Sequence, residues 1–339
     1  MEISPLGLQE CYYFFMLPLL DALRREEIER AILKTIVYSD LFDYPLTPGE
    51  VAHYLADNAV TGEQVQAVLS APRWIGGQIA KVDGYVTLQG RESLVNRRRE
   101  RAAASRRLWR IARLYARVLG LMPFVRMVAV TGALAMDNSD RRDDVDVFLV
   151  TAPDRVWLAR AFAVGIVYAG KLTGATLCPN YVLSQNVLTL EPPSVYVAHE
   201  FVQMVPIFGL DVYRRMRAAN PWAERYLPNA GRPLHEEPEY RPGWFTQSFK
   251  RAAEWLLSGR LGDRLESWEM RRKIRKFTRE SARWGGSVIL DRDQVKGHFD
   301  DHGARISRRY ESVLEAHQLT SAPCSHAATR DNDAVANLP

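Results

Sequence analysis

The sequence predicts an α+β protein on the basis of three observations. Amphipathic helical segments and a short hairpin occupy the first third of the chain. Two β-rich runs flank a glycine turn and a polar loop between Val128 and Thr151, and long helical segments follow residue 246. A chain of 339 residues with 47% apolar content is long enough for two or three domains with large cores.

Changes in composition along the chain predict where its parts begin and end. Proline and glycine residues concentrate after residue 227, which indicates an irregular linker, and the final residues have the polar composition of a disordered tail. We expect an N-terminal domain over residues 1–95, a basic linker helix over 96–122, a β-containing core over 123–230, a linker over 231–245, a helical C-terminal module over 246–319 and a disordered tail over 320–339.

Charge and cysteine content narrow the class of protein. The net charge of +5 and the isoelectric point near 9.1 suit a nucleotide or nucleic-acid ligand, although both values are also common in proteins that bind neither. Cys11, Cys178 and Cys324 are odd in number and lack CxxC spacing, so we expect no disulfide framework and no structural zinc but a reduced, cytoplasmic protein. The apolar stretch Cys11–Leu20 contains Pro18 and is about half as long as a membrane span, so it is expected to pack onto the next helix.

Three short helices are expected near the N-terminus. Apolar residues recur at helical spacing over Glu26–Tyr38. Thr47 and Glu50 have the pattern of a capping box, with a proline at the first helical position, which predicts a second helix through Leu55. The third helix is expected over Thr61–Ser70.

A β-hairpin is expected directly after these helices. Ile79–Lys81 and Tyr85–Leu88 have strand character, and the Asp83-Gly84 pair between them favours a tight turn with positive φ. Three helices followed by a hairpin is the order of a winged helix, which places its third helix in the major groove of DNA. Because Thr61–Ser70 contains no Arg or Lys, protein docking or an interdomain role is favoured over DNA binding.

A long helix with many arginines is expected over Arg91–Leu121, ended by Pro123. Its apolar stripe allows it to pack between two domains. A solvated face is the usual explanation for such a run, and an anionic partner, either a nucleic acid or a membrane surface, is the alternative. The arginines are Arg97, Arg98, Arg99, Arg101, Arg106, Arg107, Arg110, Arg113 and Arg117.

Two carboxylates follow the glycine turn. A strand over Val128–Val130 leads to Gly132, and a polar loop then precedes the sequence Asp144-Val145-Asp146-Val147. Alternate side chains of a strand share a face, so Asp144 and Asp146 are expected to point the same way while the two valines enter a core. Mg²⁺ takes oxygen ligands and usually combines one or two carboxylates with substrate phosphates, and Gly132 allows a backbone to approach a phosphate closely.

This stretch resembles the signature of the polymerase-β-like nucleotidyltransferase superfamily. Gly132-Ala133 and Asp144-Val145-Asp146-Val147 stand at the spacing of that signature. The resemblance implies a mixed sheet flanked by helices, two aspartates that bind catalytic Mg²⁺ or Mn²⁺, and a third carboxylate on a later strand. Ala133 departs from the pattern, because Gly or Ser is usual there and a hydroxyl that contacts the nucleotide phosphates is missing.

The segment after the aspartates supplies further candidates. A largely apolar helix is expected over Pro153–Leu172, and its Lys171, and also Arg160, are candidates for contact with nucleotide phosphates. A lysine at a helix end more often favours only the helix dipole. The next strand is expected over Cys178–Leu183, and it carries Asn180 where the resemblance implies an acid.

The third carboxylate has no evident place in the sequence. The amide oxygen of Asn180 is able to bind a metal or to position a nucleophile, but it is not a general base. Glu191, after an expected strand Val187–Leu190, is the alternative acid. A helix is expected over Ser194–Gly209, and its His199 and Glu200 either line the cleft or form a satisfied pair at the edge of the core.

The C-terminal module is expected to contain two main helical segments, Gln247–Arg283 and Asp293–His317, separated by Gly285-Gly286. The first carries a second run of basic residues that is expected to be a solvated helix face. His298 and His302 have a spacing at which two histidines on one helix are able to bind a metal, although the surrounding metalloprotease pattern is absent.

These features predict a metal-dependent nucleotidyltransferase. Asp144 and Asp146 are expected to hold the metal, Asn180 to assist catalysis, and Gly132, Ala133 and Lys171 to contact the nucleoside triphosphate. The hydroxyl acceptor is left open between a small molecule, an RNA end and a protein side chain. The alternative, favoured by Ala133 and by the missing third acid, is a catalytically degenerate protein that senses nucleotide or acts as a winged-helix scaffold.

Overall fold

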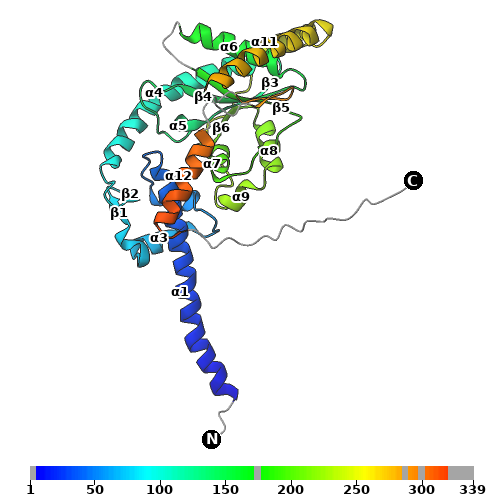
Figure 1. The fold of residues 1–339 in the computed structure, drawn as a ribbon. Coiled ribbons are helices and arrows are strands. Elements are labelled where there is room, and N and C mark those ends of the chain that lie inside the picture. Colours follow the sequence, from blue (N-terminus) through cyan, green and yellow to red (C-terminus); the bar gives the residue numbers. More distant parts are fainter. Residues whose placement is uncertain (1–4, 172–176, 285–288, 297–301, 320–339) are drawn as a thin grey trace, which may run out of the picture.

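Within the described residues, a mixed sheet of six strands lies at the centre of the fold (Figure 1). The structure, a computed structural model, describes residues 5–171, 177–284, 289–296 and 302–319. The strands have the order β6-β3-β4-β5-β8-β7, and β4 and β5 are parallel whereas the other neighbours are antiparallel. The predicted α+β class is therefore confirmed. The strand bounds are β3 Val125–Val130, β4 Val145–Thr151, β5 Leu177–Ser184, β6 Val205–Phe208, β7 Ile289–Leu290 and β8 Gln294–Lys296.

Helices cover both faces of this sheet (Figure 1). The face that buries Val145 and Val147 packs against α4 (Leu94–Leu121), α6 (Val156–Lys171) and α11 (Arg260–Trp284). The face that buries Phe148 packs against α7 (Val195–Gln203), α8 (Leu210–Ala219) and α9 (Ala223–Tyr226). Because side chains alternate along β4, Asp146 shares a face with Phe148 and points toward α7.

The N-terminal elements have a core of their own. They are α1 (Pro5–Asp40), α2 (Pro48–His53), α3 (Gly62–Ser70), the 3-10 turn η1 (Trp74–Gly77) and the hairpin of β1 (Ile79–Val82) and β2 (Tyr85–Leu88). The predicted capping box at Thr47 and Glu50 is confirmed, and α3 begins with a second one. The hairpin turn is confirmed as well, because Asp83 and Gly84 have φ values of 52° and 84°.

The start of the chain differs from the prediction. The segment Cys11–Leu20 and the helix Glu26–Tyr38 form one helix, α1, which continues through Pro18. The residues between the two predicted segments include Leu, Ala and Arg, which favour a helix, so the backbone stays helical after the proline. Part of α1 projects away from the rest of the fold (Figure 1). Within the described ranges, no helix has both the length and the apolar character needed to cross a membrane.

Two predicted elements after β5 are also wrong. Val187–Leu190 is a loop and not a strand. The predicted helix Ser194–Gly209 ends at Gln203, and β6 follows it and pairs with β3. Pro206 explains the change, because proline lacks the N–H that a helix interior needs and is tolerated on a strand at the edge of a sheet.

The C-terminal segment contributes to the core on the α4 side of the sheet and to the N-terminal core. The predicted helix Gln247–Arg283 is two helices, α10 (Trp244–Leu257) and α11, separated at Ser258-Gly259. The predicted helix Asp293–His317 begins as β8, which pairs with β5, and its described helical part is α12 (His302–Ala316). Asp291 explains the delay, since its carboxylate accepts the backbone N–H groups of Asp293 and Gln294, both at 2.7 Å, and this turn competes with a helix. Helix α12 packs against α1.

The predicted long arginine helix is confirmed as α4, and many of its arginines hold the fold together. Five of them pair with carboxylates on other elements. Arg98 is buried, and its guanidinium lies 3.5 Å from the ring centroid of Tyr44 and 2.7 Å from Glu50. A structural role therefore accounts for much of the basic run. The pairs are Arg97–Asp43, Arg98–Glu50, Arg99–Asp83, Arg101–Asp140 and Arg113–Glu237.

Replacing Glu266 by alanine is expected to destabilise the fold by about 2 kcal/mol. Glu266 on α11 accepts the backbone N–H groups of Trp157 at 2.8 Å and of Leu158 at 2.7 Å, which are free donors of the first turn of α6. Denaturant unfolding measures the effect. Asp263→Ala is the matched control, because Asp263 is exposed and its partner Arg155 keeps hydrogen bonds to the carbonyl oxygens of Asp154 and Ser258, so the loss is expected to cost less than about 1 kcal/mol. Equal losses in the two variants would contradict this role of Glu266.

Candidate functional site

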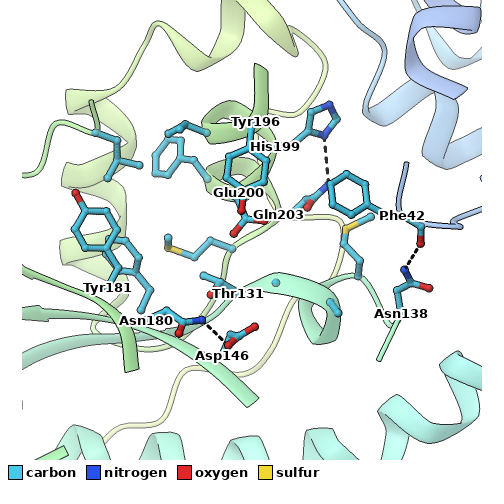
Figure 2. A pocket seen from close by; sticks show the side chains of 18 of the residues that line it. Phe42, Thr131, Asn138, Asp146, Asn180, Tyr181, Tyr196, His199, Glu200 and Gln203 are labelled. Atoms are coloured by element: carbon cyan, nitrogen blue, oxygen red, sulfur yellow. Dashed lines mark hydrogen bonds between the residues drawn. The ribbon is translucent and has the colours of Figure 1, made fainter. Parts of the chain in front are cut away.

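A cavity of about 480 Å³ lies where the sheet meets α7 and the end of α1 (Figure 2). The residues around it come from parts of the chain as distant as Tyr38 and Lys296, so it forms only when the N-terminal and C-terminal segments pack on the sheet. Its wall is rich in aromatic side chains, which offer flat apolar surfaces. These are Tyr38, Phe42, Tyr44, Tyr54, Phe148, Tyr181, Tyr196 and Phe201.

Gly132 places a backbone turn directly against a carboxylate in this cavity. The residue follows β3 with φ of +66°, and the backbone N–H of the preceding Thr131 donates to the carbonyl oxygen of Asp146 at 3.1 Å. A Cβ atom at Gly132 would lie 2.6 Å from Oδ2 of Asp146. Both the positive φ and the close approach therefore require glycine. The adjacent Ala133 begins the short helix α5 (Gly132–Ala135) with it and also lines the cavity.

Asp146 is a half-buried acid with a raised pKa. Burial, together with the negative charges of Asp144 and Asp143, raises the pKa from 3.8 to about 6. The opposing effect comes from Asn180 on the neighbouring strand β5, whose amide N–H donates to Asp146 Oδ1 (Figure 2). Asn180 therefore fixes the orientation of the carboxylate.

Asp144 stands just before β4, on the same side as Asp146. Val145 and Val147 are almost fully buried, whereas Asp144 is exposed, so the predicted alternation of acids and core valines is confirmed. Its charge reaches Asp146, as the raised pKa shows. The two carboxylates thus lie near each other at the start of one strand.

A third carboxylate enters the cavity from α7 and not from a strand. Glu200 is half-buried and points toward the side of the cavity that holds Asp146 (Figure 2). Burial, and to a smaller extent the charge of Asp146, raises its pKa from 4.5 to about 7. Lys296 lowers the pKa of Glu200, so a positive charge also lies near the pair. A carboxyl group with a pKa near neutrality is suited to take up or release a proton.

His199 has a different environment from Glu200, although both line the cavity as one of the two sequence hypotheses had it. The His199 ring is buried and stacks on Tyr38 with 3.7 Å between centroids, and Gln203 Nε2 lies 3.3 Å from its Nδ1. Burial lowers the pKa of His199 to about 3. The imidazole is therefore neutral and forms part of the aromatic wall.

Lys296 is a charged cavity residue that the sequence did not indicate. It lies on β8, in a stretch where the sequence pattern predicts a helix, and β8 is too short for a clear strand pattern. The ammonium group of Lys296 lies 5.6 Å from the ring centroid of Tyr181. The pairing of β8 with β5 brings the ammonium group of Lys296 close to Glu200.

The remaining candidates lie in different places. Glu191 is on the exposed loop after β5 and borders the cavity. Arg160 on α6 lies 5.1 Å from the ring of Phe277 on α11, and burial lowers its pKa. Lys171 is the last residue of α6, and its side chain lies outside the described part of the chain, as do those of His298 and His302.

The donor set of the cavity suits a hard cation that also contacts a substrate. Among the described residues, no group of three or more His, Cys, Asp or Glu side chains is arranged to hold a metal ion. Mg²⁺ does not need such a group, because it commonly uses one or two carboxylates and completes its shell with phosphate oxygens and water. Asp146, which lines the cavity, and the neighbouring exposed Asp144 supply that number of carboxylates, and the glycine turn lies directly against Oδ2 of Asp146.

The chain matches no protein family, no curated protein and no solved structure at a significant level. The likeness to the nucleotidyltransferase signature therefore rests on Gly132, Ala133, Asp144 and Asp146 and on the spacing between them.

Proposed function

We propose that the protein is a metal-dependent nucleotidyltransferase that moves a nucleoside monophosphate from a nucleoside triphosphate to a hydroxyl acceptor. The observation that carries this proposal is the cluster at the end of β3, where Gly132 lies against Asp146 and Glu200 faces the same carboxylate across the cavity. In this proposal the sheet with its helices is a nucleotidyltransferase core, and the first 95 residues form a winged-helix-like domain.

Asp144 and Asp146 are the proposed ligands of Mg²⁺ or Mn²⁺. When bound, the metal supplies positive charge that stabilises the phosphoryl oxygens during transfer. The acids fit this role because Asp146 is partly desolvated and surrounded by negative charge, which a cation offsets. Asn180 holds Oδ1 of Asp146 through a hydrogen bond, and the backbone turn at Gly132 lies against Oδ2.

Glu200 is the proposed general base. The acceptor hydroxyl loses its proton to the Glu200 carboxylate as its oxygen bonds to the α-phosphorus, and the bond from that phosphorus to the pyrophosphate oxygen breaks. The positive charge of Lys296 keeps part of the Glu200 population ionised near neutral pH. This acid replaces the third carboxylate that the motif places on a strand, where the chain carries Asn180.

The cavity wall supports a planar substrate group. Tyr181 and Tyr196 come from opposite sides of the cavity and present ring faces or edges to it (Figure 2). Aromatic rings stack with nucleobases without strong preference among them. We propose that the base, or an aromatic acceptor, lies among these rings while the phosphates lie near Gly132 and Lys296.

Calorimetry with each nucleoside triphosphate, with and without Mg²⁺, tests this function when pyrophosphate release is followed in the same samples. Magnesium-dependent binding together with slow pyrophosphate release is the expected result, because water replaces the missing acceptor. Addition of pools of small molecules, RNA or protein then identifies the acceptor by a faster release. If no triphosphate binds, the proposal is wrong.

A catalytically degenerate nucleotide sensor or scaffold is the second candidate. Ala133, which lacks a hydroxyl, and Asn180, which stands in the place of an acid, favour it. Tight triphosphate binding without pyrophosphate release in any acceptor pool would assign this role. DNA binding by α3 has less support, because its exposed side chains include Glu63, Gln66 and Ser70 and no cation.

Replacing Gly132 by alanine is expected to weaken magnesium-dependent triphosphate binding by about tenfold or more. The new Cβ atom would lie 2.6 Å from Asp146 Oδ2, so the carboxylate or the turn has to move, and the positive φ adds strain. Calorimetry measures the affinity. Gly231→Ala is the matched control, since no atom lies within 4 Å of its Cβ position. Unchanged binding in Gly132→Ala would show that this turn does not contact the nucleotide site.

A further inference from the structure

The helices α10 and α11 expose a large apolar surface far from the cavity. Trp244 and Trp255 are each 80% exposed, and Phe249 is 74% exposed. Four aromatic side chains on α10 alone expose on the order of 600 Å², which is as large as the largest patch of a typical monomer. The exposed apolar residues are Trp244, Phe245, Phe249, Trp255 and Leu256 on α10 and Leu261, Leu265 and Trp268 on α11.

Polar contacts hold α10 in this orientation, with its aromatic face turned outward. Lys250 is buried and donates to the carbonyl oxygens of Gly120 at 2.7 Å and Val125 at 2.6 Å. Glu254 accepts the backbone N–H of Phe124 and a guanidinium N–H of Arg126, both at 2.7 Å. An amphipathic helix ordinarily packs its apolar face inward. Here hydrogen bonds and an ion pair attach the polar face of α10 to the rest of the fold, so its aromatic face is held toward the solvent.

The charge around this apolar surface is positive. Besides Lys250, which is buried under α10, residues 244–279 contain nine Lys or Arg and four Asp or Glu. Each of the four acids has a partner, because Glu254 pairs with Arg126, Asp263 with Arg155, and Glu269 with Arg272, and Glu266 accepts backbone N–H groups. The exposed cations near the apolar residues include Arg251, Arg260, Arg264, Arg271 and Arg275.

We propose that α10 and the first half of α11 bind the surface of an anionic lipid membrane. Tryptophan, phenylalanine and leucine on one face with arginine around them is the composition of a helix that lies in a membrane interface. A nucleic acid offers no aliphatic surface that would bury the exposed leucines. A symmetric contact with a second copy places the arginines of the two chains close together, where they repel each other. An anionic membrane satisfies both the apolar surface and the cations.

This surface leaves the cavity free. Lys250 and Glu254 fix α10 to residues at the start of β3, whereas Thr131 and Gly132 follow its end. The six residues of β3 span about 20 Å, so the two sites lie at opposite ends of the strand. In Figure 1, α11 also lies far from the projecting end of α1. A membrane-bound molecule therefore keeps its cavity accessible from the aqueous side.

Vesicle flotation tests the proposal. The full chain is expected to float with vesicles of phosphatidylcholine and phosphatidylglycerol, to bind vesicles of phosphatidylcholine alone more weakly, and to dissociate as salt rises. Trp244→Ser/Trp255→Ser is expected to lower the partition coefficient by about tenfold or more. Arg251→Gln/Arg264→Gln is expected to lower it about fivefold for each arginine. Leu114→Ser, at an exposed apolar residue on α4, is the matched control and is expected to float like wild type.

Three results would overturn the assignment. The first is failure of the wild-type chain to float with anionic vesicles, and the second is equal flotation of the tryptophan variant and wild type. The third comes from light scattering and nucleic-acid titration of the same variants. A dimer that the tryptophan substitutions dissociate, or RNA or DNA binding that they abolish, in the absence of vesicle binding assigns the surface to another occupant. Circular dichroism confirms that the exposed substitutions leave the fold intact.

Discussion

Replacing Asp146 by asparagine is expected to lower the turnover of triphosphate by at least about 10³-fold without unfolding the protein. Asparagine keeps an oxygen that accepts the hydrogen bond from Asn180, but it loses the charge that holds the metal. Release of pyrophosphate at saturating Mg²⁺ measures the loss. Asp144→Asn is expected to act in the same direction, because both carboxylates lie at the start of β4.

The metal-free protein gives an independent check on Asp146. The pKa of Asp146 is about 6 in the folded state against a usual value of 3.8, so the ionised form of Asp146 destabilises the fold. Above pH 6 the Asp146→Asn variant is therefore expected to be more stable than wild type by about 2 kcal/mol, and this difference vanishes below pH 4. Loss of turnover together with gain of stability distinguishes a functional acid from a structural one.

Asp143→Asn is the matched control for these substitutions. Asp143 is the neighbouring acid, it is exposed, and its Oδ2 accepts the backbone N–H of Asp140 at 2.7 Å, a bond that the asparagine oxygen preserves. Its turnover is expected to stay within about twofold of wild type. Unchanged turnover in Asp146→Asn, or an equal loss in Asp143→Asn, would remove Asp146 from the proposed metal site.

Local patterns in the sequence were sufficient to predict the part of the site that lies on β3, β4 and the turn between them. Gly132 and the alternation of acids with Val145 and Val147 are determined by neighbours within a few residues, and the structure has them as expected. The same holds for the capping box at Thr47, where the stabilising bonds are local. The superfamily assignment itself stays a prediction.

The rest of the cavity depends on contacts between distant parts of the chain. Glu200 faces Asp146 because α7 packs on one face of the sheet, and Lys296 joins them because β8 adds to β5. Neither contact leaves a periodic signal in the sequence. The two predicted helices that failed here did so for local reasons, because Pro206 lacks the N–H that a helix interior needs and Asp291 accepts the backbone N–H groups of Asp293 and Gln294.

The environment of Glu200 leads to the second large expected effect. Glu200→Gln is expected to lower the rate constant for transfer by about 10²-fold to 10⁴-fold, while magnesium-dependent triphosphate binding changes little. The reason is that glutamine keeps the size and polarity of the side chain but accepts no proton. In wild type the rate is expected to rise with pH up to about 7 as Glu200 ionises, and the variant is expected to lose this dependence.

Glu191→Gln is the control that makes this test decisive, because Glu191 also borders the cavity but lies on an exposed loop. It is expected to retain both the rate and the pH dependence. A loss of rate in Glu191→Gln, with a normal rate in Glu200→Gln, would transfer the role of base to Glu191.

The stability of the Glu200→Gln variant gives a second test of the Glu200 charge. The pKa of Glu200 is about 7 in the folded protein and 4.5 in the unfolded chain. Its ionised form therefore destabilises the metal-free protein. The Glu200→Gln variant is therefore expected to be more stable than wild type above pH 7, by about 2 kcal/mol, and equally stable below pH 4.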